Sequence, residues 1–315
     1  MEYTADVINE IIEKGTFDDL VKISEDKHEA QYNQLMEMII DASKVSRARE
    51  INNTTDAIII SGPSSSGKTT FANELAKRLA AYDFTCHVIS VDDYYLDRDV
   101  ILERQKNMPC YDFETIEAFD VAYFKKQMNE YLNGKVIMLP RYDFPLGLRC
   151  DSNKFIVPSS KDIVIVEGLH GLNPYFTEGI DFTHKFRVYI SPRDTYSYES
   201  QIIHPWDIRF MRRACRDATH RNAGLSRTME MWPTVQSGEE KYIKPFKEDV
   251  DFTFNSSLEY EICYLKKRLI KMAKGLTPTQ YQLLGKMIPL EAILHFRSFV
   301  DFAIPKNSIF NEFSD

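Results

Sequence analysis

The fold is decided by the stretch Gly62-Pro63-Ser64-Ser65-Ser66-Gly67-Lys68-Thr69. It fits the pattern G-x-x-x-x-G-K-[ST], in which backbone amides of a glycine-rich loop hold phosphate groups. Residues 57–60 form an apolar run that predicts a buried strand, and residues 69–79 have helical spacing. Because a strand, this loop and a helix follow one another, we expect a phosphate-binding P-loop.

The residue types in this loop suit a bound phosphate. Gly62 and Gly67 permit a close backbone approach that a Cβ would block. The loop amides and the positive end of the next helix then face the anion. Lys68 can reach the outer phosphates of ATP, and the Thr69 hydroxyl can bind Mg²⁺. The residues expected to bind ATP are Gly62, Pro63, Ser64, Ser65, Ser66, Gly67, Lys68, Thr69 and Thr70.

Composition narrows the classes of partner. The chain has 315 residues, of which 43% are hydrophobic and 27% charged, as in soluble globular proteins with a sizeable core. Its formal charge of −8 argues against general binding to nucleic acid or to an anionic membrane. No apolar run has the length of a membrane span, and the acidic N-terminus lacks the pattern of a signal peptide.

The cysteines indicate a reducing compartment. There are five, and they form no C-x-x-C pair: Cys86, Cys110, Cys150, Cys215 and Cys263. Widely spaced cysteines in odd number favour free thiols, a cytoplasmic location and no zinc site. The sequence leaves the oligomeric state open, and a homo-oligomer is compatible with it.

Apolar runs alternate with helical stretches between residues 55 and 258. Strands are predicted at 57–61, 86–91, 136–139, 163–166 and 186–190, and the segment at 155–157 is expected to form a hairpin with 136–139. This alternation predicts an α/β core whose mostly parallel sheet carries helices on both faces. Residues 1–54 and 259–315 are predicted to be helical extensions, with the first boundary at the polar turn 52–55.

Local signals divide these extensions into helices. In the first extension, Gly15 is expected to end one helix, residues 16–20 to begin a second, and residues 35–40 to lie in a third. In the last, Thr277 is expected to cap one helix and Pro289 to begin another. We expect residues 296–300 to belong to that final helix.

Acidic residues follow two of the predicted strands. Asp92 and Asp93 come directly after residues 86–91, and Glu167 ends the strand at 163–166. Ligands of open α/β sheets bind beyond the carboxyl ends of the strands, so these carboxylates should lie beside the P-loop. A carboxylate there can take a proton from an attacking hydroxyl or help to hold Mg²⁺. An alternative for Asp92 and Asp93 is helix capping, and many strands end in an acidic turn.

Six arginines fall between residues 206 and 227: Arg209, Arg212, Arg213, Arg216, Arg221 and Arg227. Several share one helical face, where like charges repel, so the cluster suggests a bound anion such as phosphate. Alternatives are a solvated face paired with Asp207 and Asp217, or contact with nucleic acid, against which the acidic chain argues.

Two segments interleave aromatic and acidic residues, at 111–114 and 139–144. Rings such as Tyr142 and Phe144 could stack on a base, and a carboxylate such as Glu114 could hold sugar hydroxyls. The alternative is that these aromatics belong to the ordinary core.

Together, these segments resemble the uridine kinase/phosphoribulokinase family of P-loop kinases. The ordered matches are GPSSSGKTTFA, ISVDDYY, YDFETIEAFD, LPRYDF, VIVEGL and MRRACRDATHR. The segments FDDLVKISE, MEMWP and IPKNSI also resemble a bacterial-type subgroup of nucleoside kinases, whose further N-terminal domains are absent from this sequence.

The resemblance implies a role for each matching position. Asp92 would be the catalytic base, with Lys68 and Arg216 also assigned to catalysis. Arg216 and Arg221 would clamp the ATP phosphates from a lid at about 206–227, and Thr69 and Glu167 would lie at Mg²⁺. The acceptor would be bound by Tyr95, Glu114, Tyr142, Phe144 and Arg213, with Asp112 as the alternative to Glu114.

One departure leaves the acceptor open. The resemblance implies a base-reading histidine shortly after Phe144, where this chain has Gly147. Losing that donor removes hydrogen-bond discrimination of the base. We expect an ATP-dependent kinase acting on a nucleoside-like hydroxyl, with uridine or cytidine as models. The acceptor could instead be another alcohol, such as a sugar phosphate or pantothenate, and the donor could be GTP. A third alternative is a nucleotide-binding regulatory protein that catalyses no transfer.

Overall fold

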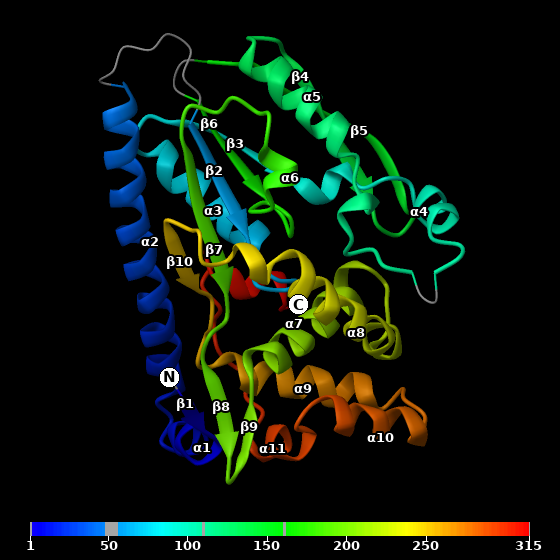
Figure 1. Cartoon of the computed structure of the whole chain (residues 1–315). Coiled ribbons are helices and arrows are strands. Elements are labelled where there is room, and N and C mark those ends of the chain that lie inside the picture. Colours follow the sequence, from blue (N-terminus) through cyan, green and yellow to red (C-terminus); the bar gives the residue numbers. More distant parts are fainter. Residues whose placement is uncertain (1, 48–55, 109–110, 160–161, 315) are drawn as a thin grey trace.

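A five-stranded parallel sheet forms the centre of the computed structural model (Figure 1). The structure describes residues 2–47, 56–108, 111–159 and 162–314. The strand order is β10-β7-β2-β6-β3. The strands are β2 (Asp56–Ser61), β3 (Thr85–Ser90), β6 (Asp162–Glu167), β7 (Lys185–Ser191) and β10 (Phe252–Asn255). The predicted α/β core with a parallel sheet is therefore confirmed, and β10 is a strand that the sequence prediction omitted.

Side chains of β2 alternate between the two faces of this sheet. Ile58 and Ile60 pack with α2 (Phe17–Arg47) and α3 (Lys68–Ala80) in one core. Ala57 and Ile59 pack in a second core with α5 (Val121–Leu132) and α6 (Pro174–Thr177). Both faces of a parallel sheet are thus buried, which explains the continuous apolar runs.

The predicted hairpin lies beside the sheet and is longer than expected. Strands β4 (Ile137–Asp143) and β5 (Leu148–Ile156) pair antiparallel. Their register shifts between Leu139 and Pro140, since proline cannot donate to the ladder and is accommodated at a bulge. Strand β4 contacts η1 (Val91–Tyr94), and the first amide of α4 (Arg98–Arg104) donates to the carbonyl oxygen of Gly147 in the hairpin turn. Figure 1 shows α4 and the hairpin, and η2 (Ile116–Ala118) precedes α5.

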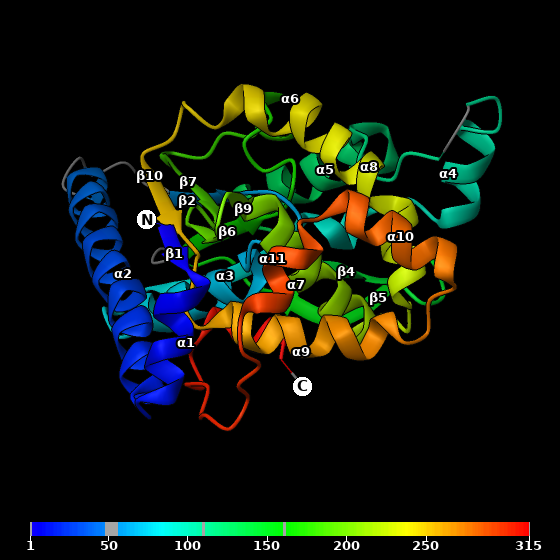
Figure 2. The same ribbon diagram turned by 90° about the horizontal axis from the view of Figure 1, so that it is seen from below.

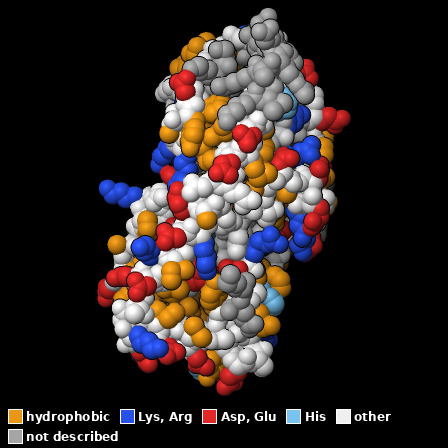
Figure 3. Space-filling model, turned by 90° about the vertical axis from the view of Figure 1, so that its left-hand side faces the viewer, with side chains coloured by type: hydrophobic (Ala, Val, Ile, Leu, Met, Phe, Trp, Pro, Cys, Tyr) orange, Lys and Arg blue, Asp and Glu red, His pale blue; other side chains and the backbone are white. Residues whose placement is uncertain are grey.

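The N-terminal segment contains a strand as well as helices. Strand β1 (Glu2–Thr4) pairs in parallel with β8 (Thr195–Tyr198), which pairs antiparallel with β9 (Gln201–Ile203). Helix α1 (Ala5–Glu13) follows, and α2 is one continuous helix where we expected two. Its buried positions follow a helical period along one face: Phe17, Leu20, Val21, Ser24, His28, Tyr32, Leu35, Met36, Ile39 and Ser43. Figures 2 and 3 show α2 along one side of the molecule, where charged side chains of both signs face outward.

The C-terminal half is mostly helical. Its elements are α7 (Pro205–His220), α8 (Leu225–Tyr242), η3 (Lys244–Phe246), α9 (Glu261–Ala273), α10 (Pro278–Met287), α11 (Leu290–His295) and η4 (Ile309–Glu312). Thr277 caps α10 in a capping box with Gln280, as its position predicts. Helix α11 ends at His295, so the expectation that it includes residues 296–300 is wrong. The chain instead turns back toward α3.

Two expectations lie outside the described residues, namely the polar boundary turn at 52–55 and the state of Cys110. The four described cysteines are free thiols. Within the described ranges, no helix combines the length and apolar content needed to cross a bilayer.

Candidate active site

The P-loop joins β2 to α3 in a conformation that depends on its glycines. A Cβ on Gly62 would lie 2.0 Å from the carbonyl oxygen of Ile190, so only glycine fits beside β7. Gly67 has a φ of 91° and precedes the first residue of α3. Ser65 adopts a left-handed φ of 60°, which is strained for a residue with a side chain. The loop therefore curls around the N-terminus of α3, where the helix dipole favours an anion.

Several polar groups of the loop suit a phosphate. Lys68 Nζ folds back to donate to the carbonyl oxygens of Gly62 (2.9 Å) and Pro63 (3.0 Å). Burial lowers the pKa of Lys68, so a bound anion would stabilise its charged form. The hydroxyls of Ser65 and Ser66 are buried and lack hydrogen-bond partners among the described residues. Since buried polar groups are normally paired, these orphaned hydroxyls are compatible with a ligand in the loop.

Thr69 and Glu167 provide a pair of oxygen ligands at the edge of the loop. The Thr69 hydroxyl donates to Glu167 Oε1 at 3.1 Å. Burial and the neighbouring Asp92 raise the pKa of Glu167 to about 7, so a cation beside it would stabilise the carboxylate. Hard oxygen ligands are those that Mg²⁺ prefers, and substrate phosphates usually complete its shell. The part of the chain that the structure describes holds no cluster of three or more His, Cys, Asp or Glu side chains able to bind a metal alone.

The structure separates the roles of Asp92 and Asp93. Asp93 Oδ1 accepts a hydrogen bond from the backbone amide of Tyr142 at 3.0 Å, so this residue fixes the hairpin to η1. Asp92 acts electrostatically on both sides of the site. Its negative charge opposes the lowering of the Lys68 pKa on the phosphate side, and raises the pKa of Glu114 on the other. Asp92 lies two residues after Ser90, the strand partner of Glu167, so it stays the candidate for the base.

The arginines divide into two sets. Arg212 is fully buried and pairs with Glu261, joining α7 to α9. Arg209 pairs with Glu239 of α8, and the exposed Arg227 pairs with Glu230. Arg212 is therefore structural, whereas Arg209 also reaches the P-loop, because its Nη1 donates to the carbonyl oxygen of Ser64 at 3.5 Å. Helix α7 itself is packed into the core along most of its length.

The remaining arginines, Arg213, Arg216 and Arg221, converge on Asp217. Arg213 Nε lies 3.3 Å from its carboxylate, Arg216 Nη2 3.4 Å and Arg221 Nη1 3.6 Å. Burial, together with repulsion from Arg216, lowers the pKa of Arg221 to about 10. Glu114 and Glu312 also lie beside two of these guanidinium groups. Arginine donates in pairs to phosphate oxygens, so the cluster suits a phosphate that joins or replaces these carboxylates.

Arg213 joins the P-loop to Glu114. Its Nη1 donates to the Ser64 hydroxyl at 2.8 Å and lies 3.8 Å from Glu114 Oε1. Glu114 is buried, and burial raises the pKa of its carboxyl group. The alternative residue, Asp112, accepts from the backbone amide of Glu114 at 2.8 Å and so supports this turn. The structure thus brings Glu114 and Arg213 together, as the predicted acceptor site requires.

Aromatic rings line the neighbouring space. The ring centroid of Tyr95 lies 5.3 Å from that of Tyr142, 6.1 Å from Phe144 and 4.0 Å from Phe119. The Tyr95 hydroxyl donates to the carbonyl oxygen of Phe113 at 3.0 Å. Tyr95, Tyr142 and Phe144 are only partly buried, so part of each ring is open to a planar ligand.

Gly147 has a backbone conformation that would be strained with any side chain. It has a φ of 72° in the turn between β4 and β5, and a Cβ there would lie 2.6 Å from the guanidinium carbon of Arg98. Arg98 Nη2 donates to the carbonyl oxygen of Phe144 at 2.5 Å. The position expected to carry a base-reading histidine is therefore covered by a different hydrogen-bond donor, Arg98.

Three residues near the site were not among the predicted site residues: Arg98, His170 and Glu312. His170 Nε2 bonds to the carbonyl oxygen of Glu114 at 2.8 Å, and burial lowers the pKa of His170 to about 4. Glu312 Oε1 lies 3.5 Å from Arg216 Nη1. His170 follows the strand that ends in Glu167, which is the one local signal that pointed to it.

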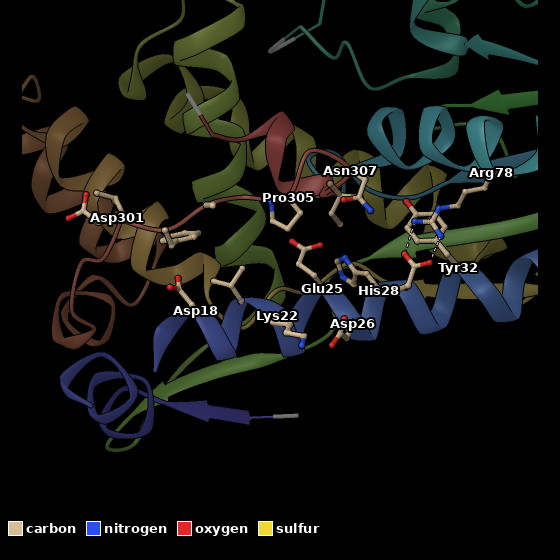
Figure 4. Close-up of a pocket in the computed structure, with 16 residues that line it drawn as sticks. Asp18, Lys22, Glu25, Asp26, His28, Tyr32, Arg78, Asp301, Pro305 and Asn307 are labelled. Atoms are coloured by element: carbon tan, nitrogen blue, oxygen red, sulfur yellow. Dashed lines mark hydrogen bonds and ion pairs between the residues drawn. The ribbon is translucent and has the colours of Figure 1, made fainter. Parts of the chain in front are cut away.

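A separate cavity lies away from this chemistry. It has a volume of about 850 Å³ between α2 and the C-terminal segment (Figure 4). Carboxylates such as Glu25 and Glu29 line it, and Arg78 pairs with Glu29. Ile309 borders both this cavity and the P-loop, but among the described residues that line the cavity there is none from the loop itself.

The central part of the chain is similar to known kinases. A model of the Phosphoribulokinase / Uridine kinase family matches residues 57–262. The uridine kinase of Lactobacillus helveticus is 33% identical over 193 residues, which cover 61% of this chain and 82% of that protein. The uridine kinase of Borrelia duttonii is 30% identical over 218 residues, covering 67% of this chain and 94% of that protein.

One solved structure supports the fold alone. The YGR205w protein superposes with a TM-score of 0.53 at 14% identity, covering 69% of this chain and 89% of that one. The family model spans well over half of the chain and contains the P-loop, Asp92, Glu167 and the arginines that meet at Asp217. The chain is therefore a kinase that transfers phosphate to a hydroxyl, and it belongs to the Phosphoribulokinase / Uridine kinase family.

Proposed function

We propose that this kinase transfers the γ-phosphoryl group of ATP to a hydroxyl of a nucleoside-like acceptor, most simply the 5′-hydroxyl of a uridine- or cytidine-like molecule. The observation that carries the proposal is the place of Asp92. It lies two residues after Ser90, which is paired with Glu167 on the metal side, and three residues before Tyr95 on the acceptor side. A base in that position serves a hydroxyl held between the two sides.

The phosphate side would neutralise charge. Lys68 and the loop amides would hold the outer phosphates, and Arg216 and Arg221 would approach them from α7 and the loop after it. Mg²⁺, held by Thr69 and Glu167, would offset the charge of the phosphates. Phosphoryl transfer needs positioning and charge neutralisation more than covalent chemistry, and this set of residues provides both.

The acceptor side would position the hydroxyl. Glu114 and Arg213 would bind the sugar, since a buried carboxylate beside an arginine offers both an acceptor and donors. Tyr95, Tyr142 and Phe144 would pack against the base. The hydroxyl oxygen of the acceptor would attack the γ-phosphorus while Asp92 takes its proton. The bond between the γ-phosphorus and the ADP leaving group would then break.

The test is transfer of labelled phosphate from ATP to a panel of nucleosides. Lys68→Ala and Asp92→Asn should each abolish most of the transfer while the circular dichroism spectrum is retained. Lys77→Ala is the matched control for the first variant, because Lys77 lies on the same helix with an exposed side chain. Near-native activity in Asp92→Asn would refute its role as the base.

A second acceptor class has one observation in its favour. Arg98 covers the position of Gly147, so a cation stands beside the aromatic pocket where a neutral donor was expected. A cation there would suit an acceptor that carries an anionic group, such as a sugar phosphate. Adding sugar phosphates and pantothenate to the panel distinguishes these acceptors, and faster turnover of any of them would replace the nucleoside proposal.

A further inference from the structure

The C-terminal segment at 304–314 crosses the P-loop, and we call it the C-terminal strap. Figure 1 shows it returning from α11 toward α3, where its last residues are drawn in red. It lies beyond residue 262, where the match to the family model ends. A segment outside the matched region thus lies against the phosphate-binding loop.

Apolar residues fix the strap in place. Ile309 packs against the loop, because a Cβ on Gly67 would lie 3.3 Å from the Cβ of Ile309. The Phe310 ring is fully buried against Tyr264, with centroids 5.4 Å apart. Phe313, which is 1% exposed, lies beneath the guanidinium of Arg212 at 5.0 Å. Anchors at these three positions hold the intervening side chains close to the site.

Glu312 lies between two of these anchors and reaches Arg216. Its Oε1 is 3.5 Å from Arg216 Nη1, while Asp217 Oδ1 is 3.4 Å from Arg216 Nη2. The guanidinium therefore has a carboxylate at each terminal nitrogen. Arg216 Nε and Glu312 Oε2 are buried and have no hydrogen-bond partner within the described residues.

The charge of Glu312 also acts on the phosphate site. Burial alone would lower the pKa of Arg216, but Asp217, Glu312 and Asp92 raise it. Glu312 also opposes the lowering of the Lys68 pKa by burial. Glu312 thus acts on two cations assigned to the phosphates, although it comes from the far end of the chain.

We propose that Glu312 is a positioning residue for phosphoryl transfer. With Asp217 it holds the two terminal nitrogens of Arg216, so that the remaining Nε faces the phosphates at the P-loop. The proposal rests on the proposed function, because it assumes that Arg216 binds phosphate. The C-terminal strap is then part of the active site of this kinase. Because two carboxylates already hold Arg216, its side chain loses less conformational freedom when ATP binds.

The experiment is a double-mutant cycle between Glu312→Gln and Arg216→Lys in the full chain. Glu312→Gln should lower kcat about tenfold and weaken a non-hydrolysable ATP analogue several-fold, with the acceptor KM within about twofold. In the Arg216→Lys background the same change should have little further effect. Glu312→Asp should recover part of the loss, because it restores the charge. Asp301→Asn is the matched control, as this carboxylate is exposed and precedes the strap.

Other outcomes would overturn the proposal. An equal loss in both backgrounds would mean that Glu312 does not act through Arg216. Tighter analogue binding in Glu312→Gln would make Glu312 a competitor of phosphate. A lower Tm with unchanged kcat and analogue affinity would make it a structural anchor. Calorimetry with the ATP analogue needs no acceptor. If the protein phosphorylated no nucleoside, the acceptor proposal would be refuted, but analogue binding by the four proteins of the cycle would still test the role of Glu312.

Discussion

The guanidinium carbon of Arg221 lies 4.3 Å from the ring centroid of Phe144. The arginine follows α7, whereas the phenylalanine follows β4 of the hairpin. A cation assigned to the phosphates of ATP thus rests on an aromatic ring assigned to the acceptor. This contact links the two substrates of the proposed reaction, because displacement of the ring would also displace the charge.

Phe144→Leu should therefore affect both substrates. A partly desolvated cation–π contact contributes about 1–2 kcal/mol, so we expect KM for the acceptor and for ATP each to rise by up to roughly tenfold. Steady-state kinetics with each substrate varied in turn measures this. Phe155→Leu is the control, since Phe155 is 62% exposed on the same hairpin. If KM rose for the acceptor and not for ATP, the Phe144 ring would not support Arg221.

Asp92→Asn and Asp93→Asn should fail in different ways. Loss of a general base costs typically about 10²–10⁴-fold in rate, so Asp92→Asn should lower kcat by that range with little change in Tm. Asp93→Asn weakens the bond to the Tyr142 amide and should lower Tm, with a smaller loss of kcat. Rapid-quench kinetics and thermal melts on both variants make the comparison. Equal kcat values for the pair would remove the distinction between the two residues.

Glu167→Gln should increase the requirement for Mg²⁺. The substitution removes the carboxylate that accepts from Thr69 and would lie at the metal. Residues that support a metal site typically contribute about 10–100-fold in metal affinity, so the Mg²⁺ concentration for half-maximal activity should rise by that factor. Titration of Mg²⁺ at saturating ATP measures it. An unchanged midpoint would place the metal elsewhere.

Arg98→Met should change the choice of acceptor. Arg98 donates to the Phe144 carbonyl and covers Gly147 at the edge of the aromatic pocket. Its removal should change the relative kcat/KM values across the acceptor panel about tenfold or more and leave the KM for ATP unchanged. Arg104→Met, an exposed change on the same helix, is the control. Parallel losses for every acceptor would indicate that Arg98 only supports the turn.

His170 should make the fold sensitive to acid. Its pKa is about 4 in the folded protein, below its ordinary value of about 6.5, so its neutral form contributes stability above about pH 6.5 that is lost as the pH falls toward 4. Between about pH 7.5 and 5 this amounts to roughly 2 kcal/mol.

Urea unfolding of wild type and His170→Gln at those two pH values isolates this contribution. His28, whose pKa burial also lowers to about 4, is present in both proteins and cancels in the difference. The stability advantage of the wild type over the variant should shrink by about 2 kcal/mol at the lower pH. A difference that does not change with pH would mean that folding does not lower the pKa of His170.

Local patterns predicted the centre of the fold well. Strands β2, β3, β6 and β7 are apolar runs because both faces of the sheet are covered. Strand β10 was omitted because its four residues, Phe252–Asn255, are too few to show a period. The pairing of β1 with β8 joins residues nearly two hundred positions apart, for which a single sequence carries no local signal.

The candidate site also has parts that the sequence predicted and parts that it could not predict. The P-loop residues were found because their spacing is fixed by contact with one ligand. The residue pattern alone did not separate Asp92 from Asp93, and only the family resemblance assigned the base to Asp92. Neighbouring residues point in different directions only once η1 has formed. Nor could it show that Arg212 is a structural ion pair, or that Arg98 and Glu312 come near the site. Those contacts depend on how α4, α9 and the C-terminal strap pack.

The carbonyl oxygen of Ile190 leaves no room for a side chain at position 62. In a saturation-mutagenesis selection, this position should thus tolerate nothing but glycine even when growth depends only on protein abundance. Position 68 should be restricted only when growth depends on catalysis. Scores from the two selections would then separate steric from chemical constraint within one eight-residue motif, which conservation alone does not do.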